Sequence, residues 1–171
     1  MFKRILIAFD TGESSRQAVS VGMLLARENR AEVALVFVAA PPVGYLSDAA
    51  FSAQRVLDEQ HDRARRLFDE VRAGAPDWMA IFEFMPEGDP AREIVVVAKR
   101  WRADLIVVGT HGAGRLESFL LGSTAQSVIH QALRPVLVVR QGVVTEEDAD
   151  VAARGDTEEV APCNAIQPMT C

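Results

Sequence analysis

The chain has 171 residues, 49% of them hydrophobic, which is enough for one domain with a substantial core. No apolar run approaches the roughly 20 residues that cross a bilayer, and the first ten residues lack a secretory cleavage site, so we expect a soluble cytoplasmic protein. The net charge is −6. Of the 24 acidic residues, seven lie in 141–171 beside one of the 18 basic residues, so residues 1–140 hold 17 of each. A neutral domain without a basic stripe argues against nucleic acid as the main partner.

Residues 1–140 alternate between apolar and amphipathic segments. Apolar runs without alternation are typical of strands buried on both faces, and apolar residues three or four apart indicate helices. We expect strands at 4–9, 32–39, 79–85, 105–108 and 135–140. The strand at 79–85 includes Glu83 and therefore suits a sheet edge. We expect helices that start at Ser14 or Ser15, run from 49 to 73, run from Asp89 through Trp101, and start at Ser123.

Capping signals mark three of these helix starts. Ser14 or Ser15 can cap the first helix, and Asp89 is followed by a proline, which suits the first position of a helix. Ser123 and Gln126 have the spacing of a capping box. Apolar residues on one face of this last helix predict its buried side: Ala125, Val128, Ile129 and Ala132.

The alternation of five strands with four helices predicts an α/β fold. Such a chain forms a parallel sheet with helices on both faces and right-handed crossovers. Ligands of these sheets bind beyond the carboxyl ends of the strands, where the winding reverses. The predicted domain spans residues 1–144, and the acidic composition of 145–171 predicts a flexible tail.

Three glycines divide the segment that follows the fourth predicted strand. Gly109 and Gly112 flank two residues, and after nine more residues come Gly122 and Ser123. Glycine lets the backbone turn sharply and lets its N–H groups approach a ligand closely, as a phosphate requires. The N-terminus of the next helix adds free N–H donors and a partial positive charge. This strand, loop and helix are therefore a candidate phosphate site.

The glycine spacing, with Asp10 at the end of the first strand and the sequence RPVLVVR as the last strand, resembles the signature of the universal stress protein family in its ATP-binding branch. The resemblance covers residues 1–140. It implies a Rossmann-like, five-stranded parallel sheet in the order 3-2-1-4-5, so that Asp10 and Gly109 would face one crevice where the winding reverses. Gly12 and Arg134 depart from the family pattern, in which serine and cysteine are frequent there. Neither position touches the glycine signature.

The resemblance assigns the adenosine end of the ligand to three residues. The Asp10 carboxylate would accept hydrogen bonds from ribose hydroxyls or help to hold a metal ion. The alternative is that it only closes the turn by accepting from the amides of Gly12 or Glu13. Val38 would offer its backbone N–H and C=O to an adenine edge while its side chain packs, and Ala8 would line the same site.

The phosphate end of the ligand would contact the glycine signature. Its residues are Gly109, Gly112, Arg115, Gly122, Ser123 and Thr124. Main-chain amides would cradle the phosphates, and the hydroxyls of Ser123 and Thr124 would donate to their oxygens. The alternatives are that the glycines only form turns and that Ser123 only caps the helix. Arg115 could bind a phosphate as a charged fork or remain a solvated loop residue.

The predicted function is that of an ATP-binding universal stress protein, a nucleotide-responsive regulatory or stress-resistance module. Mg²⁺ or Mn²⁺ can accompany the triphosphate. We expect at most slow hydrolysis and no catalytic residue, because His111 has no positioned partner and no lysine of the GxxxxGK[ST] type is present. One alternative is a nucleotide-hydrolysing or nucleotidyl-transfer enzyme, whose usual Ser-Gly-Gly-x-Asp-Ser loop is replaced here by DTGESS. A second alternative is a nucleotide-free interaction or chaperone-like module.

The expected partners follow from the last strand and from the tail. An edge strand as apolar as 135–140 is an aggregation hazard if left open, and the resemblance implies that it pairs across a two-fold axis in a homodimer. We expect neither nucleic acid nor a membrane as a partner, and the sequence does not identify a downstream protein. Cys163 and Cys171 lie in the tail, where we expect reduced, exposed thiols.

Overall fold

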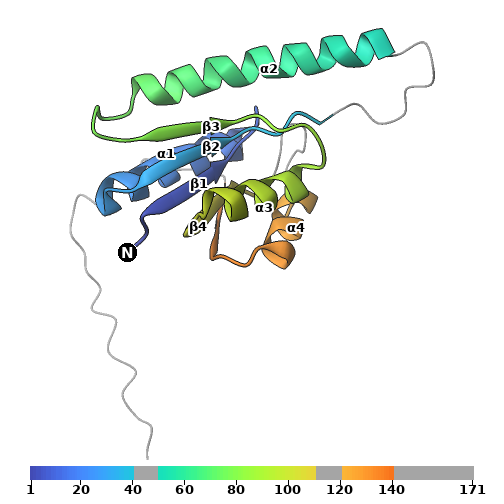
Figure 1. Ribbon diagram of the computed structural model, residues 1–171. Coiled ribbons are helices and arrows are strands. Elements are labelled where there is room, and N and C mark those ends of the chain that lie inside the picture. The colour runs from blue at the N-terminus through green and yellow to red at the C-terminus, as the bar shows by residue number, and fades with distance from the viewer. Residues whose placement is uncertain (41–49, 111–120, 141–171) are drawn as a thin grey trace, which may run out of the picture. The chain divides into compact units, whose positions relative to one another are not determined.

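The computed structural model describes residues 1–40, 50–110 and 121–140, with only the backbone described at residues 13 and 50–54. The strands there form one parallel sheet in the order β3-β2-β1-β4-β5. The predicted α/β class and strand order are confirmed. The predicted boundary at residue 144 and the acidic tail lie outside the described residues. In chain order the elements (Figure 1) are β1 (Arg4–Ala8), α1 (Glu13–Asn29), β2 (Glu32–Val36), α2 (Ala50–Ala73), β3 (Ile81–Phe84), α3 (Pro90–Trp101), β4 (Leu105–Gly109), α4 (Ser123–Gln131) and β5 (Val136–Val139).

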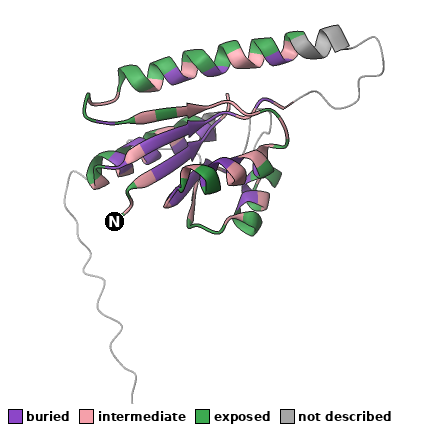
Figure 2. Ribbon diagram, in the orientation of Figure 1, coloured by how far each residue is buried: buried purple, intermediate pink, exposed green. Residues whose placement is uncertain are grey.

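The helices cover both faces of the sheet, as predicted. Successive residues of a strand point to opposite faces, so β1 contributes to two separate cores. On one face Ile7 packs in a cluster with buried residues of α1 and with Phe68 of α2. On the other face Leu6 packs with Ile94 of α3 and Val128 of α4. Figure 2 shows the central strands as the buried layer between the helices. None of the described helices has both the length and the apolar character needed to cross a membrane.

The predicted starts of α3 and α4 are confirmed, but the capping box predicted for α4 is wrong. Asp89 caps α3 because its Oδ1 accepts a hydrogen bond from the backbone N–H three residues on, at 2.9 Å. The capping box predicted at Ser123 does not form. Gly122 takes the N-cap position with φ −61° and ψ 149°, no side chain caps the helix, and Ser123 is already the first helical residue. Ile129, predicted on the buried face of α4, is 43% exposed.

Four of the five strands end earlier than predicted, whereas β4 extends one residue further, to Gly109. β1 ends at Ala8, although the Phe9 N–H still donates to the Val36 carbonyl at 3.0 Å. β2 ends at Val36 and not at Ala39, which keeps only an isolated parallel bridge to Glu87. Beyond Val36 the chain no longer pairs with β1, because β1 has already turned away. β3 and β5 form the two edges of the sheet.

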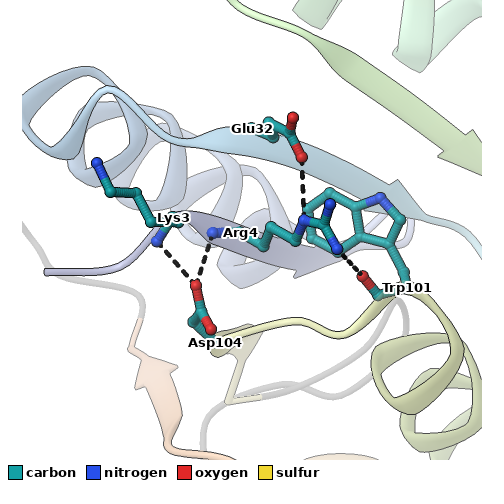
Figure 3. A network of polar contacts seen from close by, with 5 residues as sticks. All are labelled: Lys3, Arg4, Glu32, Trp101 and Asp104. Carbon is teal, nitrogen blue, oxygen red and sulfur yellow. Dashed lines mark hydrogen bonds and ion pairs between the residues drawn. The ribbon is translucent and has the colours of Figure 1, made fainter.

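A polar network fixes the amino ends of three strands (Figure 3). One oxygen of the Asp104 carboxylate, at the start of β4, accepts hydrogen bonds from the backbone N–H groups of Lys3 (2.9 Å) and Arg4 (3.0 Å). The Arg4 guanidinium pairs with Glu32 of β2 at 3.1 Å and donates to the Trp101 carbonyl at 3.2 Å. The network holds β1 in register with β2 and β4. The carboxyl ends of these three strands therefore lie together at the other end of the sheet.

Candidate functional site

A cavity of about 440 Å³ lies at the carboxyl ends of β1, β2 and β4. It opens where the strand order reverses, the position at which sheets of this kind bind ligands. Its volume lies within the range of about 300–1,000 Å³ that is usual for small-molecule sites. The described residues that line it are Ala8, Phe9, Asp10, Thr11, Ser15, Val36, Phe37, Val38, Ala40, Gln60, Arg63, Pro90, Ile94, Val108, Gly109 and Thr124. Five predicted site residues are therefore brought together: Ala8, Asp10, Val38, Gly109 and Thr124.

Asp10 lines the cavity and also closes the turn after β1. Its Oδ1 accepts a hydrogen bond from the Gly12 N–H at 2.8 Å, and its own N–H donates to the Ser15 hydroxyl at 2.6 Å. The expectation that Ser14 or Ser15 caps α1 is wrong, since Gly12 takes the N-cap position and no side chain caps the helix. The Ser15 hydroxyl holds the backbone of Asp10 instead. The half-buried carboxylate is thus fixed at the cavity wall.

Val38 lines the cavity, and its backbone N–H and C=O are placed by the hydrogen bonds of its two neighbours. Phe37 donates to the Phe84 carbonyl at 3.0 Å and Ala39 donates to the Pro86 carbonyl at 2.9 Å, both toward the β3 side. Backbone groups alternate in direction along a strand, so the N–H and C=O of Val38 point toward β1, which has already turned away. Neither group has a hydrogen-bond partner among the described residues. The Val38 side chain packs against the core on the α3 and α4 side, as expected.

Gly109 leaves no room for a side chain, because the first turn of α1 packs against it. A Cβ atom at this position would lie 2.9 Å from the carbonyl carbon, the carbonyl oxygen and the hydroxyl oxygen of Ser14. The end of β4 therefore lies directly against the first turn of α1. Any other residue here would force this part of α1 to shift.

The residue after β4 joins the other end of the glycine signature to the cavity. Thr110 donates to the Val139 carbonyl at 2.9 Å, and its own carbonyl accepts from the Gly122 N–H at 2.7 Å. This bond holds the start of α4 beside the end of β4, where Thr124 lines the cavity. Gly122 and Ser123 adjoin Thr124 in sequence but are not among the lining residues. Gly112 and Arg115, like His111, lie outside the described residues.

Sequence reasoning missed the two helices that complete the cavity. Gln60 and Arg63 contribute from α2, and Pro90 and Ile94 contribute from the first turns of α3. The Gln60 side chain accepts from the Ala40 N–H at 3.1 Å and donates from Nε2 to the Ala40 carbonyl at 3.2 Å. No local motif marks the two α2 residues. The Asp89-Pro90 pair predicts that a helix starts there, but the sequence does not indicate that this helix start faces the cavity.

The described lining carries one negative and one positive side chain, Asp10 and Arg63. Asp10 is half-buried and Arg63 is exposed. Among the described residues, no group of three or more His, Cys, Asp or Glu side chains could hold a metal ion. A divalent cation at this cavity would therefore need oxygen ligands besides the Asp10 carboxylate.

Comparison with known proteins decides the family. A model of the universal stress protein family matches residues 1–140. The chain belongs to the universal stress protein family. Universal stress proteins of Methanocaldococcus jannaschii and Thermus aquaticus are 37% identical over 145 residues and 35% identical over 142 residues. Each alignment covers 82% of this chain, with 84% of the M. jannaschii protein and 100% of the T. aquaticus protein.

Solved structures of the family share this fold. Universal stress protein UspA from Lactobacillus plantarum superposes with a TM-score of 0.73 at 21% identity, over 81% of this chain and 97% of that one. A universal stress protein in complex with cAMP superposes with a TM-score of 0.54 at 25% identity, over 82% of this chain and 99% of that one. Nucleotide binding therefore occurs within the family to which this chain belongs.

Proposed function

We propose that this universal stress protein binds ATP in the 440 Å³ cavity and acts as a nucleotide-responsive regulatory or stress-resistance module. The observation that carries the proposal is the backbone edge of Val38, which has no partner among the described residues and lines the same cavity as Asp10, Gly109 and Thr124. One donor and one acceptor on an extended strand match the edge of an adenine base. The complex of a related structure with cAMP supports an adenine nucleotide as the ligand.

In this proposal the nucleotide lies across the ends of β2, β1 and β4. Val38 reads the base, Ala8 lines the floor of the site, and the Asp10 carboxylate accepts from ribose hydroxyls. The phosphates extend toward the start of α4, whose free N–H groups and partial positive charge favour an anion. The proposed phosphate contacts are Gly109, Gly112, Arg115, Gly122, Ser123 and Thr124. Mg²⁺ or Mn²⁺ would bind between the phosphates and Asp10.

We propose slow hydrolysis at most. Phosphoryl transfer needs a group that positions the attacking water and cations that neutralise the developing charge. Asp10, the acidic residue of the described lining, already accepts from the Gly12 amide. The protein would then respond to the nucleotide that it holds, in the cytoplasm where ATP is available, and pass that state to another protein.

Mass spectrometry of ligand released by heat from the purified protein separates the candidate functions. Co-purifying ATP supports the proposed function, and ADP or AMP that accumulates from added ATP supports the hydrolytic alternative. An empty protein that also fails to bind added ATP in calorimetry supports a nucleotide-free module.

The first prediction concerns Gly122. Its backbone angles suit any residue, so Gly122→Leu should fold normally, yet its side chain would stand where phosphates approach the start of α4. We expect ATP affinity in isothermal titration calorimetry to fall about a hundredfold or more. Gly74→Leu, at the exposed end of α2, is the control and should bind as the wild type does. A Gly122→Leu protein that retains full ATP affinity would falsify this phosphate site.

We also propose a homodimer that pairs the β5 edges of two chains through residues 135–140. The three valine and leucine side chains from Val136 to Val138 are only half-buried. Leu133, just before this strand, is 89% exposed. Paired edges would cover this apolar surface and satisfy the outward backbone groups of β5.

A further inference from the structure

The α2 wall of the cavity holds a cation that the glycine signature does not include. Gln60 and Arg63 are three residues apart on α2, so their side chains lie on the same side of the helix and both line the cavity. The two hydrogen bonds between the Gln60 amide and the backbone of Ala40 fix this part of α2 to the end of β2. Arg63 is therefore presented at the cavity from a fixed position.

The guanidinium of Arg63 lacks a partner among the described residues. Three other arginines of α2 pair with nearby carboxylates: Arg55 with Glu59 at 3.6 Å, Arg65 with Asp62 at 3.5 Å, and Arg72 with Asp69 at 3.4 Å. Arg63 has no hydrogen bond and no ion pair in the part of the chain that the structure describes. Arg66 is likewise exposed and unpaired there, but it does not line the cavity.

A polyanionic ligand in this cavity would be stabilised by a cationic side chain. A triphosphate carries several negative charges, and the carboxylate of Asp10 adds another to the same cavity. Like charges that lie close together repel, and they do so more strongly at a protein surface than in bulk water. Arg63 is the one cationic side chain among the described lining residues. An arginine offers five N–H donors in a planar fork that matches phosphate oxygens.

We infer that Arg63 binds the phosphate groups of the nucleotide from α2, which packs on the other face of the sheet from α4, and makes the site select nucleotides over uncharged nucleosides. The inference rests on the proposed function, because it assigns a contact in the same cavity. It gives the long helix α2 a part in ligand selection. The phosphates would then be held from two sides, by main-chain amides near α4 and by one guanidinium from α2.

The test compares ATP with adenosine in isothermal titration calorimetry of four proteins: wild type, Arg63→Gln, Arg63→Lys and Arg66→Gln. We expect the ATP dissociation constant of Arg63→Gln to rise about tenfold, while its adenosine dissociation constant stays within about twofold. Arg63→Lys keeps the charge but not the planar fork of N–H donors. Its ATP dissociation constant should lie between those of Arg63→Gln and the wild type. Arg66→Gln removes an equally exposed charge outside the cavity and should match the wild type for both ligands.

A second readout separates a phosphate contact from a general change of the fold. Raising the salt concentration screens an exposed charge pair, so ATP binding by the wild type should weaken more steeply with salt than ATP binding by Arg63→Gln. Equal loss of ATP and adenosine affinity, or an unchanged ATP affinity in Arg63→Gln, overturns the inference while leaving the proposed function intact. A wild-type protein that binds neither ligand overturns both.

Discussion

At the scale of single residues, Gly109 has a role that its sequence context does not reveal. It belongs to a glycine pattern associated with phosphates, yet the space for its side chain is taken by Ser14 of α1 at 2.9 Å. We predict that Gly109→Ala lowers the free energy of unfolding by about 1–3 kcal/mol, because the Ser14 backbone as well as its hydroxyl must move to admit the methyl group. Urea denaturation monitored by circular dichroism measures this change.

The control for Gly109→Ala is Gly74→Ala. At Gly74 a Cβ atom would meet nothing closer than 3.8 Å, so its stability should stay within about 0.5 kcal/mol of the wild type. If Gly109→Ala proves as stable as this control, the contact with Ser14 does not determine the residue at position 109, and ligand binding alone would explain the glycine.

Site residues that follow a local sequence pattern could be identified from the sequence, whereas those that reach the cavity through contacts between distant segments could not. Asp10 and Gly109 follow strand ends, a local pattern, and once the strand order is known both must face the same crevice. Gln60 and Arg63 reach the cavity only because α2 packs on the sheet and its amide binds Ala40. Several arginines of α2 look alike in the sequence, and only the fold shows that Arg63 is the one at the cavity.

At the scale of elements, Asp104 connects two strands that are far apart in sequence. Its carboxylate accepts from the backbone N–H groups of Lys3 and Arg4, and these bonds hold the start of β1 beside β4 (Figure 3). We predict that Asp104→Ala lowers the free energy of unfolding by about 2–3 kcal/mol, since each hydrogen bond to a charged acceptor contributes about 1.5 kcal/mol or slightly less at a partly exposed site. Asp104→Asn keeps an acceptor oxygen and should lose about half as much.

Chemical denaturation checks this prediction, with Asp77→Ala as the control. Asp77 is exposed and has no hydrogen bond or ion pair within the described residues, so its removal should leave the unfolding midpoint unchanged. An Asp104→Ala protein with the midpoint of the Asp77→Ala protein would show that the amino ends of β1 and β4 are held by the sheet alone.

Helix starts show where local sequence signals are sufficient. Asp89 has a proline after it and a free amide three residues on, and it caps α3 as predicted. Ser123 has a suitable partner spacing, but the Gly122 N–H is bound to the Thr110 carbonyl and the helix begins one residue early for a serine cap. A tertiary contact that brings α4 to β4 therefore overrides the local capping preference.

At the scale of the whole molecule, the parallel sheet was predictable because its strands are continuous apolar runs separated by amphipathic helices. Helices on both faces follow from that alternation, whereas the position of the crevice also requires the strand order. The order β3-β2-β1-β4-β5 came from family resemblance, and the structure confirms it. The depth of the cavity and its α2 and α3 walls depend on how side chains pack, which alternation alone does not determine.

The open edge at β5 gives the last prediction. The Pro135 carbonyl accepts from Ile106 at 3.0 Å and the Val139 carbonyl accepts from Thr110 at 2.9 Å, so residues 135, 137 and 139 face β4 and the N–H of Val138 points away from the sheet. Val138→Pro removes that outward donor without breaking a bond to β4. In analytical ultracentrifugation at micromolar concentration we expect the wild type to sediment as a dimer and Val138→Pro as a monomer. Glu83→Pro removes an outward donor at the opposite edge and should remain dimeric. A monomeric wild type, or a dimer lost only in the Glu83 variant, would place the β5 edge outside any interface.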